Sequence, residues 1–281
     1  MTSAQAHDGE TASTSAAPAA APSVAQPEEG RSGVPVIVWR LASFALFFAV
    51  WEVMGRIPFS LALPPASDVF AALAVMIVDG ELARAYGSTV PPLLVGVAIT
   101  IVGGVLTGLL MGLSRLFEWF VLPIMVILQT APVAAIIPLL TYFYGIDARA
   151  KILAVIILGM PLVTLNSYKG IRGTSPSLLD MSRSFLGSRM QTVAFVILPS
   201  ASPMIFAGLR LGVSGAFIGI VLAELLITPT GIGDTITYNR GIARYDKMFA
   251  AIVSIIVIAA VTLALLQSLE RRLFRPEQKA A

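Results

Sequence analysis

Long apolar segments separated by short polar ones dominate the chain from about residue 35 onward. A helix needs roughly 20 mostly apolar residues to cross a bilayer. Six segments meet this condition, and we expect spanning helices at about 36–55, 88–113, 118–144, 149–168, 202–226 and 247–269. The pattern therefore predicts an all-α membrane protein with six transmembrane helices.

One further helical segment does not fit this group. Residues 66–87 carry Asp68, Asp79, Glu81 and Arg84. A charged side chain in the bilayer core is costly, so this segment is expected to form a helix that lies at a surface.

Composition supports a membrane protein and narrows the chemistry. Only 12% of the residues are charged, against about 25% in soluble domains. The chain has no cysteine, and its single histidine is His7. No carboxylate pair, metal-ligand cluster or nucleophile–base arrangement stands out. We therefore predict no catalytic residue and no metal site, and a chain that is not an enzyme.

The two ends of the chain differ from its apolar part. Residues 1–34 are rich in Ala, Ser, Pro and Glu and lack aromatic residues, a composition typical of disorder. The predicted membrane domain covers 35–276, and 277–281 form a short C-terminal tail.

The basic residues are unevenly placed, most densely at Arg271, Arg272 and Arg275. Loops rich in Lys and Arg favour the cytoplasm. Both termini and the loop at 170–200 are therefore predicted to be cytoplasmic.

The loop at 170–200 contains a predicted amphipathic helix. Ser175 before Pro176 is a typical helix start, and the helix is expected to cover 176–191. Leu178, Met181 and Phe185 fall on one stripe. A soluble partner could grip this helix and act on both flanking spans; the alternative is a helix that rests on lipid headgroups.

Polar residues inside the predicted spans are candidates for a substrate path. Gln129 and Thr130 precede Pro132, which weakens the helix and predicts either a gate or a structural kink. Arg210 would either pair with an anion or with a carbonyl or acid of the scaffold. The candidate path residues are Gln129, Thr130, Asn166, Arg210 and Ser214.

Two other features of the spans are expected to serve packing. Glu224 lies near the end of its span, and a contact with a neighbouring helix is favoured over one with an external partner. The glycines spaced by four in 104–112 and 208–219 permit close helix approach. Packing within one subunit is favoured over a dimer seam.

The stretch from Asp180 to Pro199 resembles the cytoplasmic EAA loop of bacterial ABC-type importer permeases. That family places an acidic and two small residues first, a glycine six residues later, and an aliphatic-x-Leu-Pro at the end. Here Asp180 stands at the acidic place and Leu186 at the glycine place, with Gly187 one later. The bend is therefore expected at a slightly different point. The residues implied to couple to an ATPase are Asp180, Met181, Ser182, Arg183, Ser184, Leu186, Gly187, Arg189 and Pro199.

Four further segments resemble the nitrate, sulfonate and taurine branch of this family. They are 63–73, 128–147, 198–226 and 265–276. The resemblance implies a type I ABC importer transmembrane domain in a bacterial inner membrane. We call residues 170–200 the coupling loop from here on.

The resemblance also implies partners. These are a second copy of the chain, two cytoplasmic ATPase subunits that bind ATP and Mg²⁺, an extracytoplasmic substrate-binding protein and the lipid bilayer, with no nucleic acid. The sequence has no G-x-x-x-x-G-K-[ST] phosphate loop, so no cofactor is expected in this chain. The implied substrate is a small anion such as a sulfonate, taurine or nitrate. Alternatives are an importer for an aromatic acid or vitamin precursor, or a secondary carrier.

Overall fold

The computed structural model describes residues 36–57, 62–227 and 229–274. The predicted tails at 1–34 and 277–281 lie outside these residues. Every regular element in the described part is a helix, which confirms the all-α prediction. The chain divides into two units, Met1–Leu46 and Phe47–Ala281.

Helix α1 (Val36–Arg56) crosses the division between the two units. In the first unit, the Ser43 hydroxyl donates to the carbonyl of Trp39 one turn earlier. In the second unit, the Glu52 carboxylate accepts hydrogen bonds from the Ser67 backbone N–H and hydroxyl, both at 2.9 Å. Glu52 thereby satisfies a donor in the first turn of α2 (Ala66–Val78), as a capping side chain would.

The prediction of one surface helix at 66–87 is wrong. Gly80 takes a left-handed φ of 71° and separates α2 from α3 (Glu81–Leu113). Val69 and Met76 of α2 are fully buried in the main core cluster. Helix α3 begins at Glu81 and not at the expected 88, and this acid is paired with Lys247 at 2.7 Å.

The third expected span, 118–144, is two helices. Helix α4 (Arg115–Thr130) and helix α5 (Val133–Tyr144) meet at an angle of 104°. The break falls at Ala131 and Pro132, where the sequence predicted a weak point. Among the described residues, five helices are long and apolar enough to cross a membrane, or six if this bent pair counts as one span.

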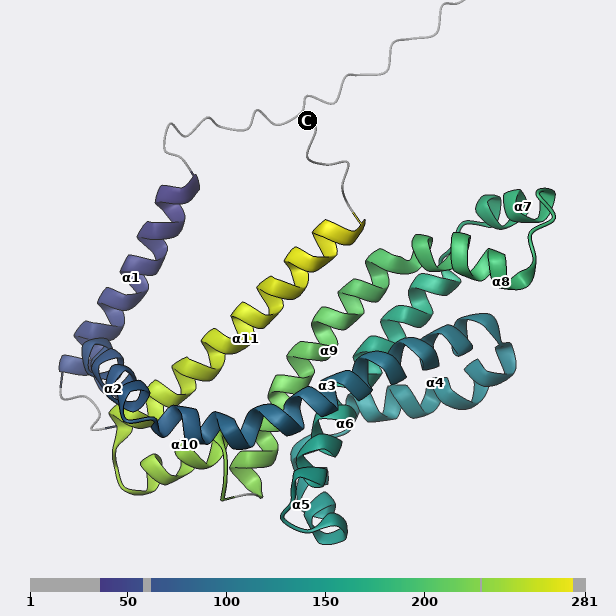
Figure 1. Ribbon diagram of the computed structural model, residues 1–281. Helices are drawn as coiled ribbons and strands as arrows, with labels where there is room; N and C mark the ends of the chain where they lie inside the picture. The colour runs from purple at the N-terminus through teal and green to yellow at the C-terminus, as the bar shows by residue number, and fades with distance from the viewer. Residues whose placement is uncertain (1–35, 58–61, 228, 275–281) are drawn as a thin grey trace, which may run out of the picture. The chain divides into compact units, whose positions relative to one another are not determined.

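Helix α6 (Ala148–Arg172) lies between α3 and α9 (Leu198–Leu226) and packs along both (Figure 1). The glycines of the two outer helices face it. A Cβ at Gly104 would lie 2.7 Å from Val163, and one at Gly219 would lie 2.7 Å from the Ala154 carbonyl. The prediction that these glycines serve packing within one subunit is therefore confirmed.

The remaining helices close the main core. Helix α10 (Ile232–Gly241) follows α9, and α11 (Tyr245–Phe274) packs against α2, α9 and α10. Ile220 of α9, Ile232 of α10 and Ile255 of α11 belong to the same buried cluster as Val69. The core thus joins segments that are far apart in the sequence.

Candidate functional site

The coupling loop contains two short helices instead of the single predicted helix at 176–191. Helix α7 covers Pro176–Ser184, and α8 covers Arg189–Thr192. A π-helical turn, η1 (Val193–Ile197), then joins α8 to α9. The single-helix prediction failed because the apolar stripe continues through Phe185 and Leu186, where the backbone already turns.

The turn between α7 and α8 is built around Leu186, whose φ is 54°. Its N–H donates to the Arg183 carbonyl at 2.9 Å, and the Gly187 N–H donates to the Ser182 carbonyl at 3.0 Å. These two bonds form a Schellman ending, in which the left-handed residue is usually glycine. The bend therefore occurs at the family's glycine place, and the expected displacement of the bend is wrong.

Gly187 is needed for space and not for its φ. A Cβ on this residue would lie 2.9 Å from the Ser182 hydroxyl and 3.0 Å from its carbonyl oxygen. The Ser182 and Thr192 hydroxyls are hydrogen-bonded at 2.8 Å, which joins α7 to the end of α8. Small residues on both sides thus allow the two short helices to approach closely.

Helix α8 begins with a capping box. The Ser188 hydroxyl accepts from the Gln191 N–H at 3.3 Å, and the Gln191 side chain accepts from the Ser188 N–H at 2.8 Å. These bonds satisfy donors that a helix start leaves open. The loop is therefore held by its own hydrogen bonds.

Helix α9 runs through both Pro199 and Pro203. Pro203 has no N–H for the Pro199 carbonyl. The Ser202 hydroxyl donates to that carbonyl instead, at 2.8 Å. The π-helical turn before Leu198 absorbs the irregularity, and the continuous apolar helix extends from Arg189 to Leu226.

Large apolar side chains of the coupling loop are exposed. Phe185 is 81% exposed, Leu186 92% and Met190 78%. Asp180 and Arg183 form an exposed ion pair at 3.0 Å beside them. Adjacent exposed apolar side chains of this size mark an interaction surface. Leu178 and Leu179 of the predicted stripe are only partly buried.

The coupling loop is attached to α4 at its first end. Arg172, in the last turn of α6, forms an ion pair with Glu118 of α4. Tyr168 donates to the other oxygen of the same carboxylate at 2.5 Å. This contact was not predicted from the sequence, because Glu118 lies 50 or more residues away from both partners.

The five candidate path residues do not form a single cluster in the structure. Gln129 and Thr130 are exposed at the end of α4. The Asn166 amide donates to the Leu162 carbonyl of its own helix at 2.7 Å. Ser214 lines an apolar groove of about 370 Å³ between α9 and α11. Within the described part of the chain, no hydrogen bond or ion pair joins any two of the five.

Arg210 has an acidic partner within the chain. Its guanidinium forms an ion pair with Glu270 in the last part of α11. The Glu270 side chain is 12% exposed and that of Arg210 36%. Of the two roles considered for Arg210, this contact supports pairing with an acid of the scaffold.

A buried polar network lies at the other end of α9. Lys151 of α6 and Glu224 of α9 form an ion pair at 2.8 Å, with side chains only 4% and 0% exposed. The Thr89 hydroxyl of α3 donates to both oxygens of Glu224, at 2.9 and 3.0 Å. We call Thr89, Lys151, Glu224 and Thr230 the buried network. It confirms the helix contact expected for Glu224, whereas Lys151 was not singled out from the sequence.

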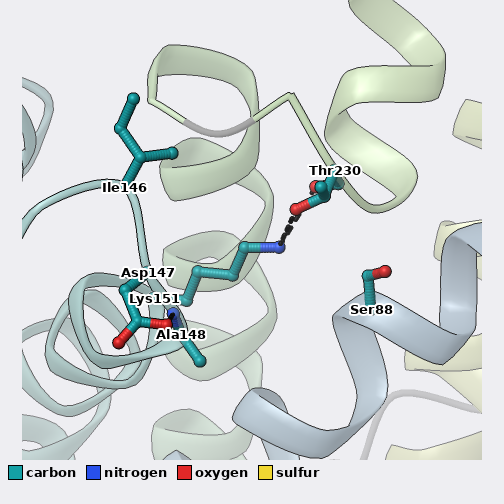
Figure 2. Close-up of a pocket in the computed structure, with 6 residues that line it drawn as sticks. All are labelled: Ser88, Ile146, Asp147, Ala148, Lys151 and Thr230. Carbon is teal, nitrogen blue, oxygen red and sulfur yellow. Dashed lines mark hydrogen bonds between the residues drawn. The ribbon is translucent and has the colours of Figure 1, made fainter.

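Figure 2 shows Lys151 extending from α6 toward Thr230 beside a small cavity of about 180 Å³. Its ammonium donates to the Thr230 carbonyl at 3.1 Å and to the Thr230 hydroxyl at 3.2 Å. Ser88 and Asp147 also line this cavity. The network therefore includes the connection between α9 and α10.

Comparisons with known proteins agree with this architecture. Residues 104–275 match the model of the binding-protein-dependent transport system inner membrane component family. The chain is 30% identical over 233 residues to SsuC of Bacillus subtilis (strain 168), a permease protein assigned to aliphatic sulfonate transport, with 82% of this chain and 84% of SsuC covered. It is 26% identical to the taurine transport system permease protein TauC of Escherichia coli (strain K12), with 83% and 87% covered.

A solved structure shares the fold. The inward-facing MetNI methionine ABC transporter superposes with a TM-score of 0.55 at 19% identity, covering 69% of this chain and 94% of that chain. The family match covers more than half of the sequence, including the coupling loop and α9. The chain therefore belongs to the family of inner membrane components of binding-protein-dependent transport systems, and it is a permease subunit of an ATP-driven importer.

Proposed function

We propose that this chain works as a homodimer whose coupling loops bind two cytoplasmic ATPase subunits and transmit their motion to the substrate path. The observation that carries the proposal is the exposed apolar surface formed by Phe185, Leu186 and Met190. In the proposed orientation the coupling loop and both termini face the cytoplasm. An extracytoplasmic binding protein delivers the substrate on the other side.

The backbone at Leu186 supports a docking role. A left-handed residue other than glycine costs roughly 1–2 kcal/mol. The Leu186 side chain is 92% exposed, so it repays little of this cost by packing within the chain. A buried position against a partner would give the leucine a stabilising role that glycine lacks.

The internal hydrogen bonds of the coupling loop also suit it to move as a rigid unit when a partner binds it. Its helices are linked by the Ser182–Thr192 hydrogen bond and by the Schellman ending at Leu186. Arg172 and Glu118 connect it to α4, which leads to the bend at Pro132. A push on the loop would thus reach α4 through this ion pair, and α9 through the continuous helix from Arg189.

The proposed substrate is a small sulfonate or a related anion, supported by the relatives SsuC and TauC. The candidate path residues are Gln129, Thr130, Asn166, Arg210 and Ser214. Because Arg210 already pairs with Glu270, anion binding there would require exchange of one carboxylate for another anion. Arg210→Gln is expected to lower the uptake rate while leaving assembly intact, and unchanged uptake kinetics would remove Arg210 from the path.

The proposal is tested by reconstitution. The permease, its ATPase and its binding protein are placed in proteoliposomes, and uptake of taurine, an alkanesulfonate and nitrate is measured with and without ATP. ATP-dependent uptake of at least one anion is expected. Uptake of an aromatic acid or vitamin precursor alone would favour the alternative importer, and uptake without the ATPase would contradict the coupling mechanism.

The coupling surface has its own test in the same system. Asp180→Lys places a cation near the exposed apolar side chains, and Gly187→Lys adds a side chain where α7 and α8 approach each other closely. Co-purification of the ATPase and ATP-driven uptake should both fall. Arg149→Met, on the exposed start of α6 at the other end of the subunit, is the control. Undiminished assembly and uptake in the two lysine variants would refute docking through this loop.

A further inference from the structure

The buried network differs from the other ion pairs of the chain in its burial. In every other pair of described residues, each side chain is at least 12% exposed, whereas Lys151 and Glu224 are 4% and 0% exposed. Removing two charges from water is costly, and the cost is offset only when their remaining hydrogen bonds are also satisfied. A buried pair in a membrane domain therefore indicates a specific role.

The hydrogen bonds of Lys151 are complete. An ammonium has three donors. Those of Lys151 reach Glu224 Oε1 at 2.8 Å, the Thr230 carbonyl at 3.1 Å and the Thr230 hydroxyl at 3.2 Å. No donor remains for an anion in the neighbouring cavity. The network is therefore better suited to joining helices than to binding a ligand.

The network also fixes where α10 begins. The first N–H groups of a helix lack partners within it, and that end favours negative charge. The Ile232 N–H donates to the Thr89 hydroxyl at 3.0 Å, and the Gly233 N–H donates to Glu224 Oε2 at 3.0 Å. Side chains from α3 and α9 thus cap α10, and the charge of Glu224 lies at its N-terminus.

Two glycines make this arrangement specific. A Cβ on Gly231, whose φ is 101°, would lie 2.1 Å from the Glu224 carboxylate. A Cβ on Gly233 would lie 2.5 Å from Cβ of Glu224. The sequence Gly231-Ile232-Gly233 therefore leaves room for this one carboxylate against the start of α10.

The network and the coupling loop lie at opposite ends of α9 (Figure 1). Glu224 is 26 residues after Leu198, which is about 39 Å along a helix at 1.5 Å per residue. The second half of the coupling loop and α9 form one continuous helix from Arg189 to Leu226. A displacement of α9 at the coupling loop therefore reaches the neighbouring helices at its other end only if α9 is firmly attached to them there.

We propose that Lys151 and Glu224 are positioning residues for transport. They hold α3, α6 and α9 and the start of α10 together as one unit, so that α10 moves with α9. This inference rests on the proposed function: the pair connects docking of the binding protein at the α10 end of α9 with the ATPase at the coupling loop. Neither residue touches the substrate in this scheme.

The test compares ATP hydrolysis with and without the binding protein. The complete complex is reconstituted with Glu224→Gln, with Lys151→Met, and with both substitutions together. Each single variant leaves one buried group without its charge partner, whereas the double variant removes both charges. Arg149→Met is the matched control, because it removes an exposed cation at the start of the same helix, α6. Thr89→Val is a milder variant that removes one hydroxyl from the network.

In the single variants, stimulation by substrate-loaded binding protein should fall about tenfold, within the usual range for coupling between two sites. The rate without binding protein should stay unchanged. The double variant should recover part of the stimulation, and Arg149→Met should match the wild type. Equal stimulation in all variants would overturn the proposal.

A merely structural role predicts a different result. Both hydrolysis rates would then fall in proportion, with an unchanged ratio of stimulated to unstimulated rate, in Thr89→Val and in the double variant as well as in the single variants. That outcome would also overturn the proposal. If the single variants do not assemble, Thr89→Val and the double variant decide between the two roles. A ratio of stimulated to unstimulated rate below that of the wild type supports the positioning role, and an unchanged ratio supports a structural role.

Discussion

The coupling loop and the buried network lie at opposite ends of α9 and use side chains in opposite ways. In the coupling loop the apolar side chains of Phe185 and Leu186 are exposed, and the charges of Asp180 and Arg183 are solvated. In the buried network the charges are inside, and each has several hydrogen-bond partners. One end is arranged to meet another molecule, and the other is arranged to hold this one together.

The difference shows that exposure must be interpreted together with position. Exposed apolar residues also cover the spans, for example Leu94 and Ile256, where lipid is the expected neighbour. The same exposure at Phe185 occurs directly after α7, a short polar helix that lies between two candidate spans. A protein partner is the better explanation there.

The largest expected effect is the difference in stability loss when a carboxylate is removed from the buried network or from the coupling loop. Glu224→Ala leaves the buried Lys151 ammonium without its charge partner, which should cost about 3–5 kcal/mol of stability. Asp180→Ala removes one member of an exposed pair and should cost less than about 1 kcal/mol. Thermal denaturation of the detergent-solubilised subunit measures both. Similar losses in the two variants would remove the contrast between the regions.

The second prediction concerns docking. Phe185→Ser should weaken binding of the ATPase by about 2 kcal/mol or more, as loss of a central aromatic anchor does. Tyr142→Ser removes an aromatic side chain of similar exposure, 83% against 81%, from the end of α5. It should leave ATPase binding unchanged. Titration of the ATPase onto each variant in nanodiscs provides the measurement, and equal affinities would exclude Phe185 from the interface.

A third, smaller effect is expected inside the coupling loop. Gly187→Ala brings a Cβ within 2.9 Å of the Ser182 hydroxyl, and should cost about 1–2 kcal/mol because the two short helices must separate. Gly241→Ala at the end of α10 is the control, since nothing lies within 4 Å of its Cβ position. Hydrogen exchange of the loop amides should increase in the first variant only. Unchanged protection would mean that α7 and α8 do not need this close approach.

The smallest expected effect is a gain in the stability of the turn that accompanies a loss of ATPase affinity. Leu186→Gly should stabilise the turn by about 1 kcal/mol, because glycine adopts a φ of 54° without strain. The same change removes an exposed apolar side chain and should weaken ATPase binding. Loop protection and ATPase affinity, measured on one preparation, are thus expected to move apart. If both increase, the leucine has no role in docking.

Much of the fold was predictable from the sequence. The all-α class and the long apolar helices follow directly from hydropathy. The weak point at Pro132 follows from its missing N–H, although the 104° angle between α4 and α5 does not. The boundary between α2 and α3 was missed, because Glu81 looked too polar for a span until Lys247, far away in the sequence, supplied its partner.

The coupling loop was also predictable from the sequence only in part. Local pattern located the coupling loop, and the family resemblance assigned its residues. The turn at Leu186 was not predicted, because a leucine with a left-handed backbone contradicts local preference. It is held there by two backbone hydrogen bonds and by the close approach of Ser182 to Thr192.

The sequence by itself determined that this chain crosses a membrane and places an amphipathic polar segment between two apolar helices, because hydropathy and helical periodicity are local properties. Only the tertiary structure decided which charges are partners. Lys151 and Glu224 are 73 residues apart, and Thr89 is 135 residues from Glu224. Pairing over such separations depends on how α3, α6 and α9 pack, and the glycine contacts that set this packing appear only when the helices are brought together.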